Sequence, residues 1–184
     1  MDENEIVAAC LRGEKEAFRR IMETHSGPAL ALALNILGNR QDSEDVCQEA
    51  FVQAYRNLVR FDGRANFRTW LLTIVYRRCL DALKRKRRFR AAVEKAGHDA
   101  HPGRGREAGS AHASMSGDDS RLPERWLGGL TPRERTALSL WADEDLSAVE
   151  IAAVLGCAAS TARVMLFNAR RKLKSSLEKD HAAS

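Results

Sequence analysis

The sequence predicts an all-α protein in which a flexible linker joins two small helical domains. Three observations lead to this fold class. Apolar residues recur at helical spacing wherever a period can be read, and no run alternates with the period of two that a half-buried strand needs. A long central segment is rich in Gly, Ala, Ser and His and has almost no large apolar side chains. The length of 184 residues suits one ordinary domain or two small ones.

The first domain is predicted to span residues 1–90 and to contain five helices. They are expected at residues 3–12, 15–25, 28–37, 43–59 and 67–88, separated by the segments RGE, SG, GNRQD and FDGRAN. The last helix changes along its length, from the nearly apolar FRTWLLTIVY to the strongly basic LKRKRRFR. Apolar side chains cover more than half of its surface at the start, so we expect its first half to be buried.

A narrow stripe on this last helix remains available for contacts with other molecules. Its members follow one another at spacings of three or four and share one face: Trp70, Thr73, Arg77, Asp81, Lys84 and Arg88. Cations neutralise phosphates, and an aromatic ring can stack on a base that has left the duplex. The stripe therefore favours melted DNA as a ligand. The alternative is a core tryptophan followed by a solvated run of charge.

The helix before it is expected to present an acidic, amide-rich outer face, although the chain as a whole carries a net charge of +5. This face consists of Asp45, Gln48, Glu49, Gln53 and Arg56. It suits docking on a basic protein partner in a way that does not compete with DNA. The alternative is that these side chains are simply solvated.

Residues 91–121 are predicted to be the linker, because a segment with so few large apolar side chains cannot offset the entropy of folding. The second domain is predicted over residues 122–180. Capping boxes begin two of its helices, at Thr131 and at Ser147, and Gly156 suits the end of the second. A longer basic helix follows over residues 160–177. This order is the helix-turn-helix plan, whose second helix enters the DNA major groove, and the alternative is a small bundle with a solvated last helix.

The sequence also argues against several classes of protein. It offers no carboxylate cluster for two-metal chemistry, no Ser/His/Asp or Cys/His set and no phosphate-cradling glycine loop, so we expect neither an enzyme nor a cofactor or bound metal. The four cysteines are dispersed and lie at or beside apolar helical positions, which is typical of reduced core thiols. No apolar run is long enough to span a membrane, and the acidic N-terminus does not resemble a signal peptide. We therefore expect no membrane insertion and a cytoplasmic location.

Several segments together resemble the bacterial RNA polymerase sigma factors of the extracytoplasmic-function (ECF) group. GEKEAFRRIMETH resembles the opening helix of that family, LGNRQDSEDVCQEAFVQAY its polymerase-binding helix, and RFDGRANFRTWLLTI with LDALKRKRR its promoter-melting and minus-ten segment. LTPRERTAL and LSAVEIAAVLG resemble its minus-thirty-five-binding domain. The resemblance covers nearly all of the chain except the linker, and the order and spacing of the segments make it specific.

The resemblance implies a specificity subunit that directs core RNA polymerase to promoters and has no catalytic chemistry of its own. It also implies three partners, namely core polymerase, promoter DNA and an anti-sigma factor. The residues expected to bind polymerase are Asp45, Gln48, Glu49 and Gln53. Those expected to contact minus-ten DNA are Asp62, Arg64, Asn66, Trp70, Thr73, Arg77, Lys84, Arg85 and Arg88. Those expected to contact minus-thirty-five DNA are Ser160, Thr161, Arg163, Val164, Met165, Asn168 and Arg171.

The sequence departs from the common pattern of this family in two segments. Arg77 stands where an Asn is common, and the apolar Val164 and Met165 replace polar residues of the recognition helix. Both apolar side chains are expected to point away from the core, where they would touch either thymine methyl groups or a protein. A second hypothesis also stays open, that of a helix-turn-helix regulator that binds duplex DNA without polymerase.

Overall fold

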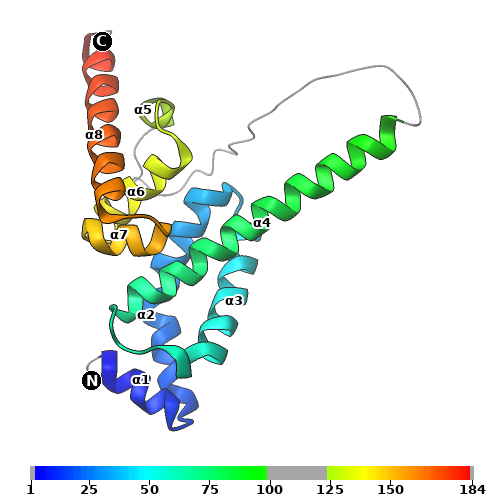
Figure 1. The fold of residues 1–184 in the computed structure, drawn as a ribbon, viewed down its shortest axis with the longest axis vertical. Coiled ribbons are helices and arrows are strands. Elements are labelled where there is room, and N and C mark those ends of the chain that lie inside the picture. Colours follow the sequence, from blue (N-terminus) through cyan, green and yellow to red (C-terminus); the bar gives the residue numbers. More distant parts are fainter. Residues whose placement is uncertain (1–2, 99–123, 183–184) are drawn as a thin grey trace.

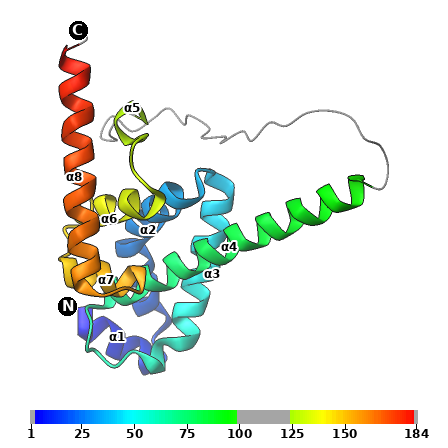
Figure 2. The ribbon, with the colours of Figure 1, turned by 45° about the horizontal axis from the view of Figure 1, so that its top comes forward.

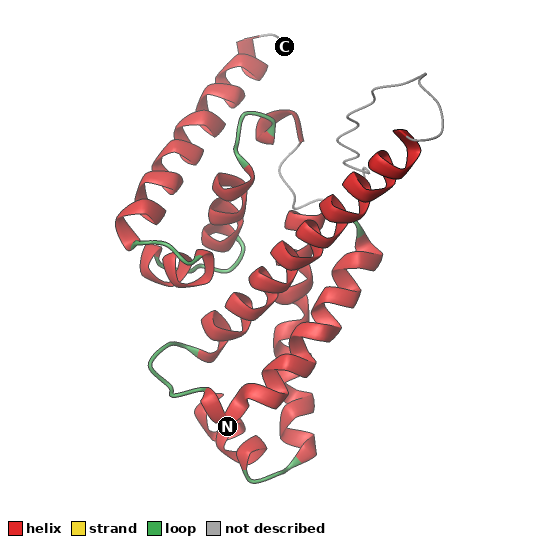
Figure 3. Ribbon diagram, turned by 45° about the vertical axis from the view of Figure 1, so that its right-hand side comes forward, coloured by secondary structure: helices red, strands yellow, loops and turns green. Residues whose placement is uncertain are grey.

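The computed structural model describes residues 3–98 and 124–182, and every regular element in these two ranges is a helix (Figure 3). The all-α fold class is therefore confirmed. The first range holds α1 (Glu3–Leu11), α2 (Lys15–Leu37), α3 (Arg40–Asn57), the 3-10 turn η1 (Leu58–Arg60) and α4 (Phe67–His98). The second range holds α5 (Glu124–Leu127), α6 (Pro132–Ala142), α7 (Ala148–Leu155) and α8 (Ala159–Ala182).

Helices α2, α3 and α4 pack against one another, and α1 packs on α2 (Figure 1). The expectation of two helices at residues 15–25 and 28–37 is wrong, because α2 is one helix with Pro28 inside it. A proline in a helix interior costs about 3 kcal/mol, since it removes a hydrogen bond and crowds the preceding turn. Here Ile21 before the proline and Leu32 after it are both buried in the same core, so tertiary packing favours a continuous helix.

Helix α4 extends further than expected. It continues past Arg90 to His98, so residues 91–98, the first part of the expected linker, are helical. The segment AAVEKA in this stretch consists mostly of good helix formers, which can prolong an existing helix without burying a face. The rest of the expected linker that precedes α5 lies outside the described residues.

The second domain starts its helices where the sequence predicts. The side chain of Thr131 accepts a hydrogen bond from the backbone N–H of Glu134, and Glu134 Oε2 accepts one from the N–H of Thr131 at 2.8 Å. Ser147 and Glu150 form the same reciprocal box at the start of α7. Gly156 ends α7 with a φ of 64°, a left-handed conformation that favours glycine. Both predicted capping boxes and the glycine stop are confirmed.

The two domains pack directly against each other. Helix α7 contacts α4, and α6 contacts α2, so that one apolar cluster runs from the first domain into the second. Figures 1 and 2 show α7 beside the first turns of α4, while the end of α4 projects away from all the other helices. The start of α4 is therefore an interdomain surface as well as a core element.

In the described part of the chain, no single helix is long and apolar enough to cross a membrane. Helices α7 and α8, which meet at 104°, reach that length and apolar composition only when they are counted together as one bent pair.

Candidate protein- and nucleic-acid-binding surfaces

A groove between α3 and α4 contains all four residues predicted to bind polymerase. We call it the α3–α4 groove; its lining residues are Asp45, Gln48, Glu49, Val52, Gln53, Arg56, Asn57, Arg78 and Arg85. Asn39 starts α3 by accepting a hydrogen bond from the N–H of Asp42 at 2.9 Å. The buried face of α3, with Val46, Ala50 and others, then turns the acidic and amide side chains outward. The predicted outer face is thus one continuous surface.

Cations from α4 reach across this groove to the acidic face. The guanidinium of Arg78 donates to Gln53 Oε1 at 2.6 Å and to Glu49 Oε2 at 3.2 Å. Arg85 lies 4.0 Å from the same Glu49 oxygen, and Lys86 forms an ion pair with Asp42. Sequence reasoning missed Arg78 and assigned Arg85 to DNA. Arg78 and Arg85 are seven residues apart, so they share a helix face that differs from the predicted stripe. This spacing could have indicated in the sequence that the two arginines face another surface.

The loop of residues 62–66 is shaped by its own side chains. Asp62 Oδ1 accepts a hydrogen bond from the N–H of Arg64 at 3.1 Å, and Gly63 between them has a φ of 70°. Asn66 Oδ1 accepts from the N–H of Arg68 at 2.9 Å, which caps the start of α4. Residues 62–66 are all exposed. The loop is therefore accessible and held in a defined turn next to the helix that follows.

The stripe on α4 combines a packed aromatic with exposed cations. Trp70 is half-buried and packs on Phe61 and Phe67, with ring centres 5.4 Å apart in both cases. The hydroxyl of Thr73 donates to the carbonyl of Thr69 at 2.8 Å. The remaining predicted cations of the stripe, Arg77, Lys84 and Arg88, are exposed. Trp70 is thus both a contributor to the core and a partly accessible ring.

The first turns of α8 present most of the residues predicted to contact minus-thirty-five DNA. Ser160, Thr161, Arg163, Val164 and Arg171 are exposed, and Asn168 is half-buried.

Met165 differs from the expectation that it points away from the core. Its side chain is half-buried and packs against the apolar cluster, because its position on α8 lies beside the buried Leu166 and Ala162. Val164 does point outward, with 58% of its surface exposed. Only one of the two apolar replacements is therefore placed for contact with another molecule.

Sequence reasoning missed an aromatic pair next to this surface. Phe167 is 66% exposed and, with Trp141 of α6, lines a second groove between α8 and the α6–α7 turn. The guanidinium of Arg170 lies 3.8 Å from the ring centre of Trp141, a cation–π contact. Phe167 follows Val164 by three residues on the helix, so the two share a face that the pattern of α8 could have revealed.

Two capping glutamates stay ionised in the second domain. Burial by itself would raise the pKa of Glu134, but hydrogen bonds from Lys172 and Thr131 outweigh it and lower that pKa below its usual range. Hydrogen bonds from the Ser147 side chain and backbone lower the pKa of Glu150, and Thr69 adds to this effect. A glutamate whose pKa is lowered in the folded state stabilises the fold at pH values above the ordinary Glu pKa. This contribution to stability is lost as the pH falls through the lowered pKa.

The buried cysteines behave as core thiols. Burial raises the pKa of Cys47 to about 11 and that of Cys79 to about 12, so both remain protonated and unreactive at neutral pH. Among the described residues no group of three or more His, Cys, Asp or Glu side chains is placed to hold a metal ion.

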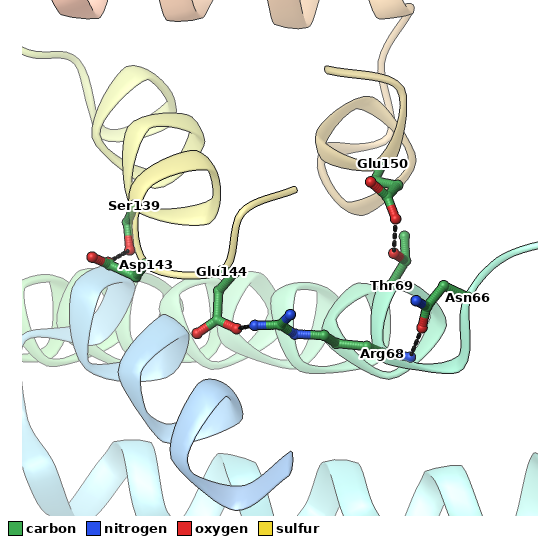
Figure 4. A network of polar contacts seen from close by, with 7 residues as sticks. All are labelled: Asn66, Arg68, Thr69, Ser139, Asp143, Glu144 and Glu150. Atoms are coloured by element: carbon green, nitrogen blue, oxygen red, sulfur yellow. Dashed lines mark hydrogen bonds and ion pairs between the residues drawn. The ribbon is translucent and has the colours of Figure 1, made fainter. Parts of the chain in front are cut away.

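Two polar contacts join α4 to the second domain (Figure 4). The guanidinium of Arg68 forms an ion pair with Glu144 of the α6–α7 turn. The hydroxyl of Thr69 donates to Glu150 of α7 at 3.4 Å. Glu150 belongs to the capping box of α7, so the element that starts α7 also contacts the first turn of α4. These contacts lie directly beside the 62–66 loop.

Comparison with known families and proteins decides the kind of protein. Residues 21–89 match Sigma-70 region 2, and residues 124–173 match Sigma-70, region 4. The RNA polymerase sigma-H factor of Pseudomonas aeruginosa is 29% identical over 181 residues, which cover 96% of this chain and 94% of that protein. The ECF RNA polymerase sigma factor SigW of Bacillus subtilis is 27% identical over 180 residues, covering 90% and 91%. The chain belongs to the ECF group of RNA polymerase sigma factors.

A solved structure agrees with this assignment. CnrH, in a complex with the cytosolic domain of CnrY, is 27% identical and has a TM-score of 0.64. The match covers 95% of this chain and 96% of that one. The fold alone is also shared with the sigma factor RpoE of Bartonella quintana, at 20% identity and a TM-score of 0.62. In this sigma factor, region 2 contains the α3–α4 groove, the 62–66 loop and the basic stripe, and region 4 contains α6, α7 and the first turns of α8.

Proposed function

We infer that this sigma factor binds core RNA polymerase and directs it to specific promoters for transcription initiation. The observation that supports this function most directly is that α4 presents two different surfaces. One side of the helix faces the α3–α4 groove, where acidic and amide groups gather, and a second side carries the exposed cations Arg77, Lys84 and Arg88 together with the half-buried Trp70. A protein partner and a nucleic acid can therefore occupy one domain at the same time.

The predicted residues receive separate roles in this proposal. Asp45, Gln48, Glu49 and Gln53 in the α3–α4 groove contact polymerase. The exposed 62–66 loop captures a base of the non-template strand that has left the stack, since the edge of a stacked base is hidden from a reader. The cations of α4 hold the phosphates, and the exposed side of α8 enters the major groove at the minus-thirty-five element.

An anti-sigma factor is the third partner that we propose. CnrH and the RpoE of Bartonella quintana were solved with CnrY and with the anti-sigma factor NepR, respectively. A cytoplasmic location, the compartment of bacterial RNA polymerase, follows from the proposed function. The chain supplies recognition, and polymerase supplies the chemistry of RNA synthesis.

Run-off transcription tests this function. Core polymerase is incubated with a pool of genomic fragments, with and without the chain, and the transcripts are sequenced. We expect a small set of start sites that appear only when the chain is present. A chain that shifts duplex DNA by itself but adds no start sites to core polymerase would instead be a helix-turn-helix regulator.

A further inference from the structure

The ion pair between Arg68 and Glu144 joins residues that are 76 positions apart in the chain. Arg68 lies in the first turn of α4, and Glu144 lies in the turn between α6 and α7 (Figure 4). The Glu144 side chain is only 8% exposed, whereas that of Arg68 keeps 31% of its surface exposed. The carboxylate is thus enclosed at the interdomain contact, and the guanidinium remains at its edge.

The position of Arg68 makes it a candidate ligand for a phosphate. In the sequence it follows Asn66, whose side chain caps α4 through the Arg68 N–H, by two residues and precedes the partly accessible Trp70 by two. Both residues are proposed to contact the minus-ten strand, so we expect the backbone of that strand to pass the start of α4. A guanidinium binds carboxylate and phosphate with the same planar pair of donors. Arg68 was absent from the minus-ten residues predicted from the sequence.

The closed packing of the domains withdraws this guanidinium from DNA. Glu144 accepts from one terminal nitrogen, while the buried Nε of Arg68 has no hydrogen-bond partner among the described residues. Part of its donor capacity therefore remains unused in the closed arrangement. On the same side, Glu150 of α7 contacts Thr69, which places α7 beside the first turn of α4.

We propose that Glu144 occupies, in the free chain, the place that a phosphate of the non-template strand takes on Arg68 when the minus-ten element is bound. The inference rests on the proposed function. Closure of the two domains and engagement of the minus-ten strand then compete for one guanidinium. Polymerase removes the competition by holding the domains on two promoter elements about two duplex turns apart. The interdomain contact thereby limits DNA binding by the chain before it has joined polymerase.

The test measures binding of the full chain to a fluorescent single-stranded oligonucleotide. The oligonucleotide carries the non-template minus-ten region of a promoter found by run-off transcription. We expect Glu144→Gln to tighten binding by the free chain roughly three- to tenfold, since a charge-assisted hydrogen bond no longer competes. Asp145→Asn is the matched control, because it removes the neighbouring charge of the same turn and should leave the affinity unchanged. Asp145 has a φ of 50°, which asparagine tolerates.

Arg68 variants separate competition from a general charge effect. Arg68→Ala should weaken binding by the free chain, and adding Glu144→Gln to it should restore nothing. In holoenzyme, where the domains are apart, Glu144→Gln should have no effect. Arg68→Ala should still weaken promoter binding there and lower the magnitude of the salt slope by about 0.7, the value for one phosphate of a single strand. Thermal unfolding of each variant confirms that it is folded, and Glu144→Ala repeats the test without a side chain that can hydrogen-bond Arg68.

Three results would overturn the inference. Equal tightening by Glu144→Gln and Asp145→Asn would show a nonspecific charge effect. Unchanged binding in Glu144→Gln would show that the carboxylate does not compete, and unchanged promoter binding by Arg68→Ala holoenzyme would show that Arg68 is not a phosphate ligand. The proposed function falls only if the wild-type chain also adds no start sites in run-off transcription, so the two failures can be told apart.

Discussion

The two halves of α4 are continuous in backbone but opposite in environment. In the first half, Phe67, Leu71, Leu72, Val75 and Cys79 are almost completely buried, with α2 and α3 of the first domain and α7 of the second packed around the helix. In the second half, every residue from 84 to 95 is exposed, and the helix projects away from the rest of the protein (Figure 2).

This difference separates two physical tasks. Tertiary packing fixes the first half in space, so the 62–66 loop and Trp70 next to it can be held in the defined geometry that reading a base requires. The second half depends mainly on helix propensity and on ion pairs with α3, such as Lys86 with Asp42. A projecting row of cations attracts any phosphate backbone. We therefore expect specificity to come from the first half and sequence-independent affinity from the second.

The largest expected effect lies in the α3–α4 groove, which borders both halves of the helix. Asp45→Arg combined with Gln48→Arg places two cations on the proposed polymerase surface, where like charges cost several kcal/mol. We expect the affinity for core polymerase, measured by fluorescence anisotropy, to fall more than about a hundredfold. Both side chains are exposed, so thermal unfolding should be unchanged. Glu23→Arg, at an exposed position of α2, is the control. If the double variant forms holoenzyme at wild-type affinity, the groove is wrongly assigned to polymerase.

The burial contrast itself is tested by matched truncations in the two halves. Leu71→Ala removes a side chain with no exposed surface and should lower the free energy of unfolding by about 2–5 kcal/mol, through lost burial and a remaining cavity. Phe89→Ala removes a larger side chain that is mostly exposed and should change it by less than about 0.5 kcal/mol. Urea denaturation measures both. Similar losses would mean that the end of α4 packs on another part of the protein in solution.

The division between affinity and specificity is tested on promoter DNA with holoenzyme. Lys84→Ala with Arg88→Ala should weaken binding to all promoters alike, because both cations are expected to neutralise phosphates. The magnitude of the salt slope should fall by up to about 0.9 for each phosphate that the variant no longer neutralises.

Asn66→Ala should instead change the preference at one minus-ten base, with about 1–3 kcal/mol of discrimination lost. Competition between promoter variants measures this preference. Unaltered base preference in this variant would exclude Asn66 as a reader, provided that loss of the α4 cap has not unfolded the protein.

The smallest expected effect concerns two neighbouring arginines that point to different surfaces. Arg78→Ala removes the hydrogen bonds to Glu49 and Gln53, so we expect the affinity for core polymerase to fall a few-fold as the groove loosens. Arg77→Ala, one residue earlier on the exposed stripe, should reduce promoter binding and leave polymerase binding unchanged. Equal effects of the two substitutions on both ligands would mean that α4 does not divide its surfaces in this way.

The sequence alone determined the all-α class, the capping boxes at Thr131 and Ser147 and the face that carries Asp45 and Gln48. These features depend on residues within about four positions of one another, because helical periodicity and capping are local. A pattern of this range can be read directly from the chain. The family resemblance led to the roles that we propose for these surfaces. The family itself is confirmed by the regions matched in both domains.

Only the tertiary structure decided what lies between the helices. It made α2 continuous through Pro28, turned Met165 toward the core and aimed Arg78 at Glu49. It also brought Arg68 to Glu144 across 76 positions of the sequence. The physical reason is that such contacts depend on how helices cross and on which side chains compete for the same enclosed space. That geometry is a property of all the packed elements together, whereas the periodicity of a helix belongs to each segment alone.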